Sequence, residues 1–580
     1  MIFESPWPKV ELPECSVWEK VWSNPRKRSD GEVAVVDGPT GRTLSRGQLR
    51  NLSQRTAHGF RHAARLDPGD VVLLFSPNSF YYHMIVLATQ CAGCVFSGAN
   101  AAYTTSELAH QVGDSEAKLL LVHPSILEVA LSATKALGWS EKRQQERIIL
   151  AVRKDEAAPA DARFLTLDYL ISDRSLEPHV IAKPRETVAY LGYSSGTSGR
   201  AKGVMTSVYN MTSVLSMLAP LEVHEGDVSL VVLPLNRTSF AQSPLRGFQK
   251  PLLTDSSLRF RPDIYGLTKL LHWPVLVGTP VVIMPKFDIS SLCALVEKYR
   301  CTICMLVPPI ALALARDPVV TKYNLKSLRL VISGAAPLGP ELEKELAKRL
   351  EGCNVIQAYG LTESSPTTHV AVVPKRGSIG PNLPMLRSRI VDPETGEDLG
   401  VGQPGELLLN APSIMLGYHR RPDATAETLV KDSNGDTWLR TGDIVYVDEE
   451  GYHYVTDRLK ELIKVKGFQV APAELEAILL ECPLVSDCAV IGIWSESSQT
   501  EYPRAYIVLS SVGKKEQDPA QAIHAWMKGK VAHYKQLKGG IKLVESVPKS
   551  PSGKLLRRLL RDQAKQELAQ EEASKTKAKL

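Results

Sequence analysis

The sequence of 580 residues lacks several features that mark other classes of protein. Its longest apolar runs, such as residues 71–75, are far too short to cross a membrane, so we expect no membrane span. Residues 1–8 contain neither a basic region nor an apolar region, and we therefore expect no secretory signal. The net charge is only +6, and the basic residues are interleaved with acids. This pattern argues against a nucleic-acid partner.

Cysteine is scarce and odd in number, with nine residues in the chain. An odd count without a secretory signal is typical of a reducing compartment, where disulfides are rare. Two Cys-x-x-Cys pairs are present, Cys91/Cys94 and Cys301/Cys304. Both pairs lie in apolar surroundings and far apart in the sequence, so we expect buried thiols rather than a zinc site.

A chain of this length exceeds one hydrophobic core and predicts two or more domains. Through the first three quarters, short β-branched strands alternate with helical patterns. One clear unit has a strand at 328–332, a short turn, and a helix from about Pro340 with Leu342, Leu346 and Leu350 on one face. This βα organisation predicts an α/β fold with a mostly parallel sheet covered by helices.

The character of the sequence changes after about residue 458. A lysine-rich segment, 460–466, precedes a helix that begins near Ala471, and strands are predicted at 488–493 and 505–509. These elements indicate a small α+β domain, followed by a charged helical tail from Arg557 to the end. The predicted domains are 1–458 and 459–580.

The most informative segment is glycine-rich and spans residues 193–203. It holds three glycines, four side-chain hydroxyls of Ser and Thr, and Lys202, directly after the apolar run 188–191. Such a loop after a strand lets backbone N–H groups approach a phosphate. It is not a Walker loop, because Gly203 follows the lysine where that motif has Ser or Thr. The alternative interpretation is a plain flexible turn.

Five further segments accompany this loop in the order that one enzyme superfamily has them. They span residues 333–339, 357–363, 439–443, 457–469 and 548–554. Together the six resemble the adenylate-forming (AMP-binding) superfamily, which includes acyl-CoA synthetases, aryl-CoA ligases, luciferases and peptide-synthetase adenylation domains. The resemblance covers nearly the whole chain. Segment 464–470 most resembles the 4-coumarate–CoA ligase branch.

The resemblance implies a fold and a reaction. The fold is a large N-terminal domain of two α/β sheets plus a small β-barrel, followed by a small mobile α+β C-terminal domain. The reaction joins a carboxylic acid to ATP, giving acyl-AMP and pyrophosphate, and then transfers the acyl group to CoA as a thioester. Two anions must meet in the first step, so positioning and cationic stabilisation have to supply the catalysis. The implied cofactors are ATP, Mg²⁺ and CoA.

The resemblance also assigns roles in nucleotide binding. The residues that would cradle the phosphates are Ser194, Ser195, Gly196, Thr197, Ser198, Gly199 and Lys202. Those that would bind the adenosine part are Gly334, Ala335, Ala336, Tyr359, Gly360, Asp443 and Arg458. Thr362 would meet the α-phosphate, and Glu363 would help to hold Mg²⁺, a hard cation that prefers oxygen ligands.

The C-terminal segments carry the remaining roles. Lys554 would deliver an ammonium group to the carboxylate and α-phosphate for adenylation, although a lysine beside Arg557 and Arg558 can also be a plain surface residue. Lys464 and Gln469 match positions that bind AMP in the coumarate-ligase branch, and Lys460 matches the hinge of the C-terminal domain. Gly467 would line the tunnel for the pantetheine thiol.

The pattern is interrupted where the acyl pocket wall is expected. The family has two or three residues between the strand at 230–235 and Ile264–Tyr265–Gly266–Leu267, whereas this chain has 28, Asn236 to Asp263. The stretch is rich in Ser, Pro and Arg, shows no periodicity, and resembles translated non-coding sequence. The family's aromatic–His pair is missing. Tyr265, Gly266 and Gly334 remain as predicted substrate-binding residues. At position 208 the family usually has His, whereas this chain has Val208. We interpret this change as structural in effect.

Two other functions stay open at this point. Asp263 lies near the position at which peptide-synthetase domains hold an amine, so the chain could be a stand-alone enzyme that adenylates an amino acid. The residues before Asp263 do not fit that motif, and no carrier-protein segment follows. The second alternative is a catalytically impaired nucleotide-binding homologue, an interpretation that depends entirely on the interruption.

The chain ends in Ala578, Lys579 and Leu580, a small–basic–leucine tripeptide that resembles the Ser-Lys-Leu peroxisomal address. A polar run, 571–577, precedes it and would leave the terminus accessible. We therefore expect the peroxisomal matrix as location and a peroxisomal import receptor as partner, beside the carboxylic acid and CoA. The alternative is an ordinary charged tail on a cytoplasmic enzyme.

Overall fold

A computed structural model describes most of the chain. The described residues are 1–158, 161–194, 201–233, 235, 266–334, 338–458, 461–465, 468–495, 500–528, 530–531, 533–548, 555, 557 and 559–567. At Ser194, Asp457, Arg458, Lys464, Phe468 and Gln469 the description is limited to the backbone.

The first large sheet has eight strands in the order β19-β10-β9-β5-β4-β6-β7-β8. They are β4 (Val71–Phe75), β5 (Val95–Ala99), β6 (Leu119–Val122), β7 (Ile148–Leu150), β8 (Leu165–Thr166), β9 (Val188–Ser194), β10 (Lys202–Ser207) and β19 (Gly417–Tyr418). The pairs from β9 through β8 are parallel, whereas β10 pairs antiparallel with both β9 and β19. The antiparallel edge therefore lies on the side that carries the glycine-rich loop.

The second large sheet also has eight strands, in the order β16-β15-β14-β13-β11-β12-β2-β3. They are β2 (Val33–Asp37), β3 (Thr43–Ser45), β11 (Ser229–Val231), β12 (Val281–Ile283), β13 (Ile303–Leu306), β14 (Leu330–Ser333), β15 (Asn354–Gly360) and β16 (Thr367–Val370). Its inner pairs are parallel, and only the end pairs β15–β16 and β2–β3 are antiparallel. The expected α/β organisation with mostly parallel sheets is confirmed.

A third, antiparallel sheet stands where the small barrel was expected. Its six strands are β1 (Ile2–Glu4), β17 (Arg387–Val391), β18 (Gly405–Asn410), β20 (Leu429–Lys431), β21 (Thr437–Val447) and β22 (His453–Arg458). The described pairings follow the path β1-β17-β18-β21-β20, with β22 also on β21. Among the described residues the sheet is thus open between β1 and β20 rather than closed.

Helices cover the sheets of the first 458 residues. They are α1 (Val17–Trp22), α2 (Arg46–His62), α3 (Tyr82–Cys91), α4 (Thr105–Asp114), α5 (Leu127–Ala136), α6 (Glu141–Arg147), α7 (Leu167–Leu170), α8 (Val208–Met217), α9 (Trp273–Val277), α10 (Ile289–Tyr299), α11 (Pro308–Arg316), α12 (Pro340–Arg349) and α13 (Pro422–Thr428). Short turns are η1 (Pro124–Ile126), η2 (Lys154–Glu156), the π-helical η4 (Gly266–His272), η5 (Pro318–Lys322) and η6 (Thr362–Ser364). Every residue of α3 and of α8 is buried.

One hydrophobic core joins the two large sheets. Because strand side chains alternate between faces, Val72 and Leu74 of β4 point into this core, while Leu73 and Phe75 belong to a second cluster with residues of α4 and α5. The same large core includes strands of the second sheet and Ile390 of the third. The three sheets therefore share one buried interior, which positions their loops relative to one another.

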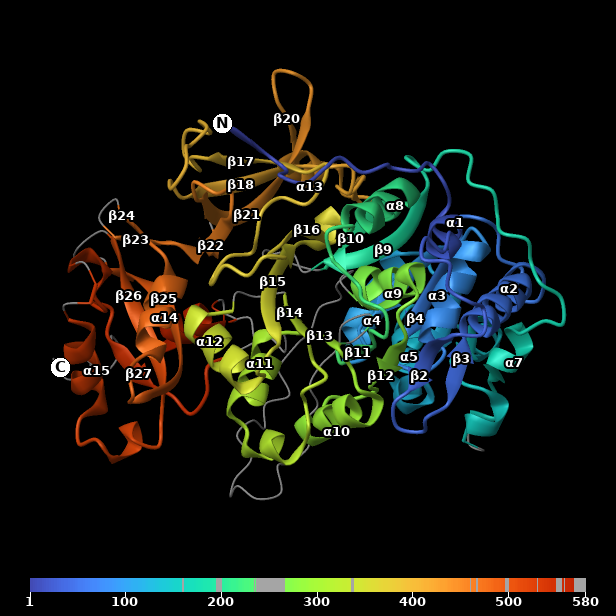
Figure 1. Cartoon of the computed structure of the whole chain (residues 1–580), viewed down its shortest axis with the longest axis horizontal. Coiled ribbons are helices and arrows are strands. Elements are labelled where there is room, and N and C mark those ends of the chain that lie inside the picture. The colour runs from blue at the N-terminus through green and yellow to red at the C-terminus, as the bar shows by residue number, and fades with distance from the viewer. Residues whose placement is uncertain are drawn as a thin grey trace.

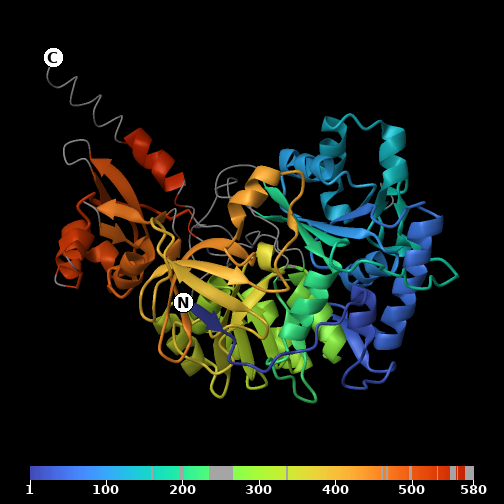
Figure 2. The ribbon, with the colours of Figure 1, turned by 90° about the horizontal axis from the view of Figure 1, so that it is seen from above.

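The C-terminal part has sheets and cores of its own. It contains β23 (Ile463–Val465), β24 (Phe468–Val470), α14 (Pro472–Leu480), β25 (Val485–Ser495), β26 (Thr500–Leu509), η8 (Gly513–Lys515), α15 (Pro519–Met527), η9 (His533–Lys535) and β27 (Ile541–Leu543). Two hydrophobic clusters draw their buried members from residues 463–564 only. Both views show this part at the end of the molecule opposite the first sheet (Figures 1 and 2). The boundary at residue 458 stays a prediction.

The local sequence predictions agree with these bounds. The helix expected from about Pro340 is α12, and Leu346 and Leu350 are buried on its inner side while Leu342 is partly buried. The strand expected at 488–493 is the centre of the longer β25, and the strand expected at 505–509 is the C-terminal half of β26. Among the described residues, no helix combines the length and the apolar character that a membrane crossing requires.

The four cysteines of the Cys-x-x-Cys pairs are all buried, as expected. Burial raises the pKa of the Cys91, Cys94 and Cys301 thiols to about 12, and that of Cys304 further still. These thiols are therefore neutral and packed as small apolar groups at neutral pH.

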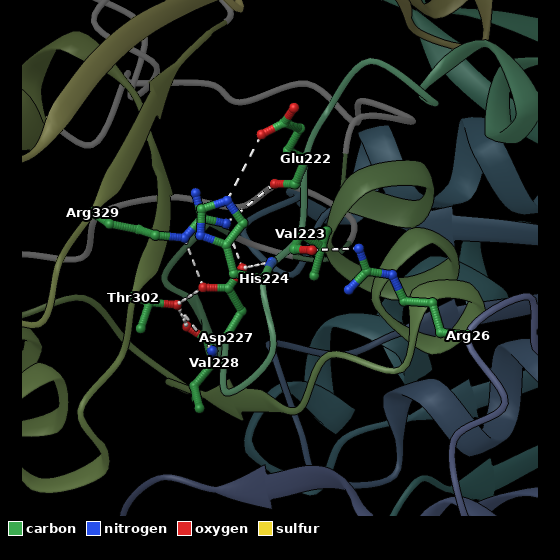
Figure 3. Close-up of polar contacts among 8 residues, drawn as sticks. All are labelled: Arg26, Glu222, Val223, His224, Asp227, Val228, Thr302 and Arg329. Atoms are coloured by element: carbon green, nitrogen blue, oxygen red, sulfur yellow. Dashed lines mark hydrogen bonds and ion pairs between the residues drawn. The ribbon is translucent and has the colours of Figure 1, made fainter.

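An ion pair between the buried Asp227 and the partly buried Arg329 fixes the loop that leads from α8 into β11 (Figure 3). The Asp227 carboxylate accepts hydrogen bonds from the Arg329 guanidinium, from the Thr302 hydroxyl at 2.7 Å and from the His224 N–H at 2.7 Å. Thr302 precedes β13 and Arg329 precedes β14, so Asp227 ties together the starts of three neighbouring strands. A bidentate ion pair of this kind is stronger than a neutral hydrogen bond and also fixes how the two side chains are oriented. It anchors the sheet edge opposite the strand ends that carry the candidate site.

Candidate active site

The glycine-rich loop joins two antiparallel strands. In the register of β9 and β10, Lys202 lies opposite Ser194, so residues 195–201 form the connection. The Tyr193 hydroxyl donates to Asp114 at 2.8 Å, and a ring nitrogen of His110 lies 2.9 Å from the Ala201 carbonyl oxygen. Both ends of the connection are therefore attached to α4. The predicted phosphate-binding residues Ser195, Gly196, Thr197, Ser198 and Gly199 themselves lie outside the described residues.

Lys202 and Glu363 flank the same tyrosine ring. The Lys202 ammonium lies 5.0 Å from the ring centroid of Tyr418, whose hydroxyl donates to the Glu363 carboxylate at 2.8 Å. Burial, and then the negative charge of Glu363, raise the pKa of Tyr418 well above its ordinary value. The hydroxyl therefore stays protonated and acts as a donor to the carboxylate. The structure thus brings the predicted phosphate-binding lysine close to the predicted Mg²⁺-binding carboxylate.

The turn that carries Thr362 and Glu363 is tightly packed. Thr362 is buried, and the Glu363 carbonyl oxygen accepts the Met415 N–H at 2.9 Å. A Cβ atom on Gly360 would lie 1.5 Å from the Pro366 carbonyl oxygen, so only glycine fits there. Packing alone therefore requires glycine at position 360, whether or not Gly360 also binds the nucleotide as predicted.

The predicted adenine and ribose residues contact each other directly. The Tyr359 hydroxyl donates to the Asp443 carboxylate at 2.6 Å, and Asp443 is only 3% exposed. In the antiparallel register of β21 and β22, Asp443 lies opposite Arg458. The backbone therefore sets the two residues predicted to surround the ribose side by side. The rings of Tyr359 and His369 pack in an edge-to-face arrangement, with their centroids 5.7 Å apart.

A glutamine holds the loop that follows β14. Gly334, at the end of this strand, donates its N–H to the Leu306 carbonyl oxygen at 3.1 Å. Beyond residues 335–337, the Gln357 side chain bonds both backbone groups of Leu338, at 2.8 and 3.1 Å, and donates to Glu343 at 3.3 Å. Burial raises the pKa of Glu343. The predicted adenine-binding residues Ala335 and Ala336 lie outside the described residues.

The C-terminal predictions are described only in part. The register of β23 and β24 sets Lys464 opposite Gln469, so the two predicted AMP-binding positions are backbone neighbours. Lys460, Gly467 and Lys554 lie outside the described residues, as do Ala578, Lys579 and Leu580.

The predicted acyl wall is described from Gly266 onward, while Tyr265 and the interruption lie outside the described residues. Gly266 is buried at the start of η4. Two residues later, the Thr268 hydroxyl donates to the Ser365 carbonyl oxygen at 3.2 Å, so η4 lies directly beside the turn of Thr362 and Glu363. Val208 is the buried first residue of α8, which agrees with a structural role.

Tyr418 and Gln357 are site residues that the sequence analysis missed. Gln357 is the first residue of the motif segment 357–363. Nothing in its spacing shows whether its side-chain amide bonds a neighbouring loop or the residue is an ordinary member of a strand. Tyr418 belongs to a two-residue strand and shows no periodicity. Among the described residues, no group of three or more His, Cys, Asp or Glu could hold a metal ion. A cation held by Glu363 would therefore need most of its ligands from phosphate oxygens and water, which is the usual arrangement for Mg²⁺.

Comparison with protein families gives a consistent result along the chain. The family model for AMP-binding enzymes matches residues 21–238 and 264–419, and the model for the C-terminal domain of AMP-binding enzymes matches 474–554. The residues left unmatched between the first two ranges, 239–263, fall inside the predicted interruption.

Curated relatives align over nearly the full length. A probable 4-coumarate–CoA ligase 1 of Dictyostelium discoideum is 35% identical over 578 residues, which cover 97% of each chain. The 4-coumarate-CoA ligase 1 of Narcissus pseudonarcissus is 35% identical over 574 residues, covering 97% of this chain and 96% of the relative.

Solved structures share the fold. ATP-bound MatB from Rhodopseudomonas palustris superposes with a TM-score of 0.78 at 26% identity, over 94% of this chain and 98% of that one. The anthranilate CoA ligase AuaEII in complex with anthranoyl-AMP gives a TM-score of 0.79 at 23% identity, over 97% and 99% of the two chains.

Proposed function

The chain belongs to the family of AMP-binding enzymes, and we propose how its residues divide the work of an ATP-dependent acyl-CoA ligase. The enzyme is an AMP-forming acid–thiol ligase. The observation that carries the residue assignment is the Lys202–Tyr418–Glu363 arrangement, because it sets a cation and a carboxylate around one ring beside the glycine-rich loop.

In the adenylation step, a carboxylate oxygen of the acid attacks the α-phosphorus of ATP and pyrophosphate leaves. Lys202 and the loop 194–199 bind the phosphates, and Thr362 meets the α-phosphate. Lys554 supplies the ammonium that offsets the repulsion between the two anions. Preorganised cations and donors of this kind are the main source of rate in such reactions. Asp443, Arg458, Lys464 and Gln469 bind the nucleoside and AMP.

Glu363 is the residue that would hold Mg²⁺. When bound, the ion would neutralise phosphate charge. The hydrogen bond from Tyr418 fixes one carboxylate oxygen of Glu363 and leaves the other for the ion. Such a partner behind a metal ligand orients the ligand and tunes its affinity.

The second half-reaction transfers the acyl group from AMP to the thiol of CoA. Lys460 serves as the hinge about which the C-terminal domain, residues 459–580, turns between the two steps, and Gly467 lines the path of the pantetheine thiol. The acid is of the arylalkanoic class or of the medium- to long-chain aliphatic class. The support for the aryl class is the similarity to relatives named 4-coumarate–CoA ligases. Tyr265, Gly266 and Gly334 contact this acid.

The experiment measures AMP release by the purified full chain with ATP, Mg²⁺ and CoA. The acids to compare are 4-coumarate, cinnamate, hexanoate and dodecanoate, with a set of amino acids beside them. Acid- and CoA-dependent AMP release supports the proposal. CoA-independent pyrophosphate exchange with an amino acid alone would favour the amino-acid adenylation enzyme instead.

A variant without residues 239–263 serves as the control for the interruption. If the full chain is inactive with every acid while this variant is active, the full-length form is the impaired nucleotide-binding homologue. If neither form releases AMP or exchanges pyrophosphate, the proposed assignment is wrong.

We also propose that the enzyme works in the peroxisomal matrix, on the strength of the terminal Ala578–Lys579–Leu580 and the chemistry of acyl-CoA formation. An import receptor would read this tripeptide. The cytoplasm is the alternative location.

A further inference from the structure

Arg557 lies at the centre of a buried charge cluster in the C-terminal part. Its guanidinium forms ion pairs with Glu476 at 2.6 Å and with Glu461, and it also donates to the Val490 carbonyl oxygen at 3.2 Å. Arg557 and Glu476 are each 7% exposed. Glu476 in turn accepts the Val490 N–H at 2.7 Å. One planar guanidinium therefore joins Glu461, helix α14 and strand β25 in a fixed geometry.

The cluster joins two segments that carry proposed functional residues. Glu461 directly follows Lys460, the proposed hinge, and Arg557 comes three residues after Lys554, the proposed adenylation residue. Three residues of chain reach at most about 11 Å, so chain connectivity keeps Lys554 close to this anchor. Glu461 and Arg557 are 96 residues apart in the sequence, yet they form one ion pair.

We propose that Arg557 is a positioning residue, which couples the hinge segment to the lysine-bearing segment through Glu461 and Glu476. Under this coupling the C-terminal domain turns as one body, and Lys554 is delivered to the same place in each adenylation cycle. This inference rests on the proposed roles of Lys554 and Lys460. It goes beyond them because it assigns to the Glu461–Arg557 pair an effect on adenylation that acts only through Lys554.

A burial argument separates the two acidic partners. Removing Arg557 would take the guanidinium away from the buried Glu476 carboxylate, and breaking a buried ion pair in this way is strongly destabilising. Removing the charge of Glu461 keeps the Arg557–Glu476 pair, because each carboxylate bonds a different part of the guanidinium. Glu461→Gln is therefore the variant that loosens the coupling while the domain stays folded.

The experiment is a double-mutant cycle of Glu461→Gln and Lys554→Ala, with the best acid of the panel above. Adenylation is measured as pyrophosphate exchange, and thioester formation is measured separately from preformed acyl-AMP and CoA. We expect Glu461→Gln to lower adenylation about tenfold and to leave the thioester step within about twofold. In the Lys554→Ala background, Glu461→Gln should change adenylation by less than about twofold.

Glu474→Gln is the matched control. Glu474 lies on the same helix α14, two residues from Glu476, and pairs with Lys535 at 2.7 Å outside the Arg557 cluster. Glu474→Gln removes the same charge as Glu461→Gln and breaks one ion pair, but it leaves the Arg557 cluster unchanged. It should therefore leave both half-reactions at the parent rate. The melting temperature of all variants is measured to show that they are folded.

Three outcomes would overturn the inference. The first is an equal loss from Glu461→Gln with and without Lys554, which is the sign of a merely structural role. The second is an equal loss in both half-reactions. The third is no loss at all. A Lys554→Ala variant that adenylates at the parent rate would instead remove the role proposed for Lys554, and the inference with it.

A second measurement does not depend on activity. Trypsin cleaves after lysine, so the rate of cleavage at Lys554 in the folded protein can be followed by mass spectrometry. We expect Glu461→Gln to raise this rate at least about fivefold over Glu474→Gln, since local opening governs cleavage of folded chains. Equal rates in the two variants would contradict the anchoring role of Arg557.

Discussion

The hydroxyl of Tyr359 donates a hydrogen bond of 2.6 Å to the buried carboxylate of Asp443. The two residues come from different sheets, β15 and β21, and are the proposed adenine and ribose ligands. One hydrogen bond therefore couples the two halves of the nucleoside site. A ligand that needs both residues benefits because the protein has already oriented them.

Tyr359→Phe should weaken ATP binding and leave the chemical step nearly unchanged. A hydrogen bond to a charged group is worth about 1.5–3 kcal/mol. We expect KM for ATP to rise about tenfold, which corresponds to about 1.4 kcal/mol, with kcat within about twofold. Steady-state kinetics with varied ATP is the measurement.

Tyr454→Phe is the matched control for this change, because Tyr454 also donates to an aspartate, Asp448, at 3.1 Å but carries no proposed contact with the nucleotide. The control should keep the parent KM. An unchanged KM in Tyr359→Phe would show that the Tyr359–Asp443 bond has no part in binding.

Tyr418→Phe should raise the Mg²⁺ concentration that half-saturates adenylation. The phenyl ring is kept beside Lys202, and only the hydroxyl that donates to Glu363 is lost. Loss of a residue that orients a metal ligand costs roughly 10–100-fold in metal affinity. We expect a shift of about tenfold in a Mg²⁺ titration of pyrophosphate exchange.

Tyr506→Phe, which removes a comparable 3.2 Å bond to Glu567 in the C-terminal part, should show no shift in Mg²⁺ dependence. A Mg²⁺ titration of Tyr418→Phe that overlays the parent curve would argue against Glu363 as the Mg²⁺ ligand.

Asp227→Asn should destabilise the protein in a pH-dependent way. Burial opposes ionisation, yet hydrogen bonds from Arg329 and Thr302 hold the pKa of Asp227 below its ordinary value of 3.8. A carboxyl with a lowered folded-state pKa stabilises the protein above its unfolded pKa and loses that contribution as the pH falls through the folded pKa. We expect a loss of about 2 kcal/mol at pH 7.

The difference between parent and Asp227→Asn should therefore be constant from pH 7 to about pH 5 and shrink below about pH 4. Urea unfolding at several pH values measures it. Thr321→Val, which removes an exposed 2.8 Å hydroxyl bond on η5, is the control and should show no such dependence. A difference that persists unchanged at pH 3.5 would rule out the charged pair as its source.

Lys460→Pro should separate the two half-reactions. Proline fixes φ near −65° and removes the N–H, so a pivot at this position would be blocked. We expect acyl-AMP formation to persist while transfer to CoA collapses, as for a domain rotation that gates one step. Lys460→Ala keeps the backbone freedom and is the control. Thioester formation at the parent rate in Lys460→Pro would exclude the hinge.

The terminal tripeptide makes a prediction about location. A fluorescent protein fused to the N-terminus leaves Leu580 free, and the fusion should give a punctate peroxisomal signal in cells. Deletion of Ala578, Lys579 and Leu580 should make the signal diffuse. A diffuse signal from the intact fusion would favour the cytoplasm.

The sequence by itself determined the elements whose signal is local. The unit of β14 and α12 was predictable because β-branched residues, Pro340 and the leucines at helical spacing all act within a few residues. The α/β class and the burial of Cys91 and Cys301 followed from the same kind of information. The family also followed, because its six motifs are short and occur in order.

Only the tertiary structure decided which distant residues meet. No pattern in the sequence pairs Lys202 with Tyr418, Tyr359 with Asp443, or Glu461 with Arg557. The first contact joins neighbouring strands that are far apart in the sequence, the second joins separate sheets, and the third joins distant segments of the C-terminal part. Their partners are chosen by how the buried faces of the sheets and helices pack together. Side-chain periodicity fixes which face of an element is buried, but the neighbour on that face is set by packing in three dimensions.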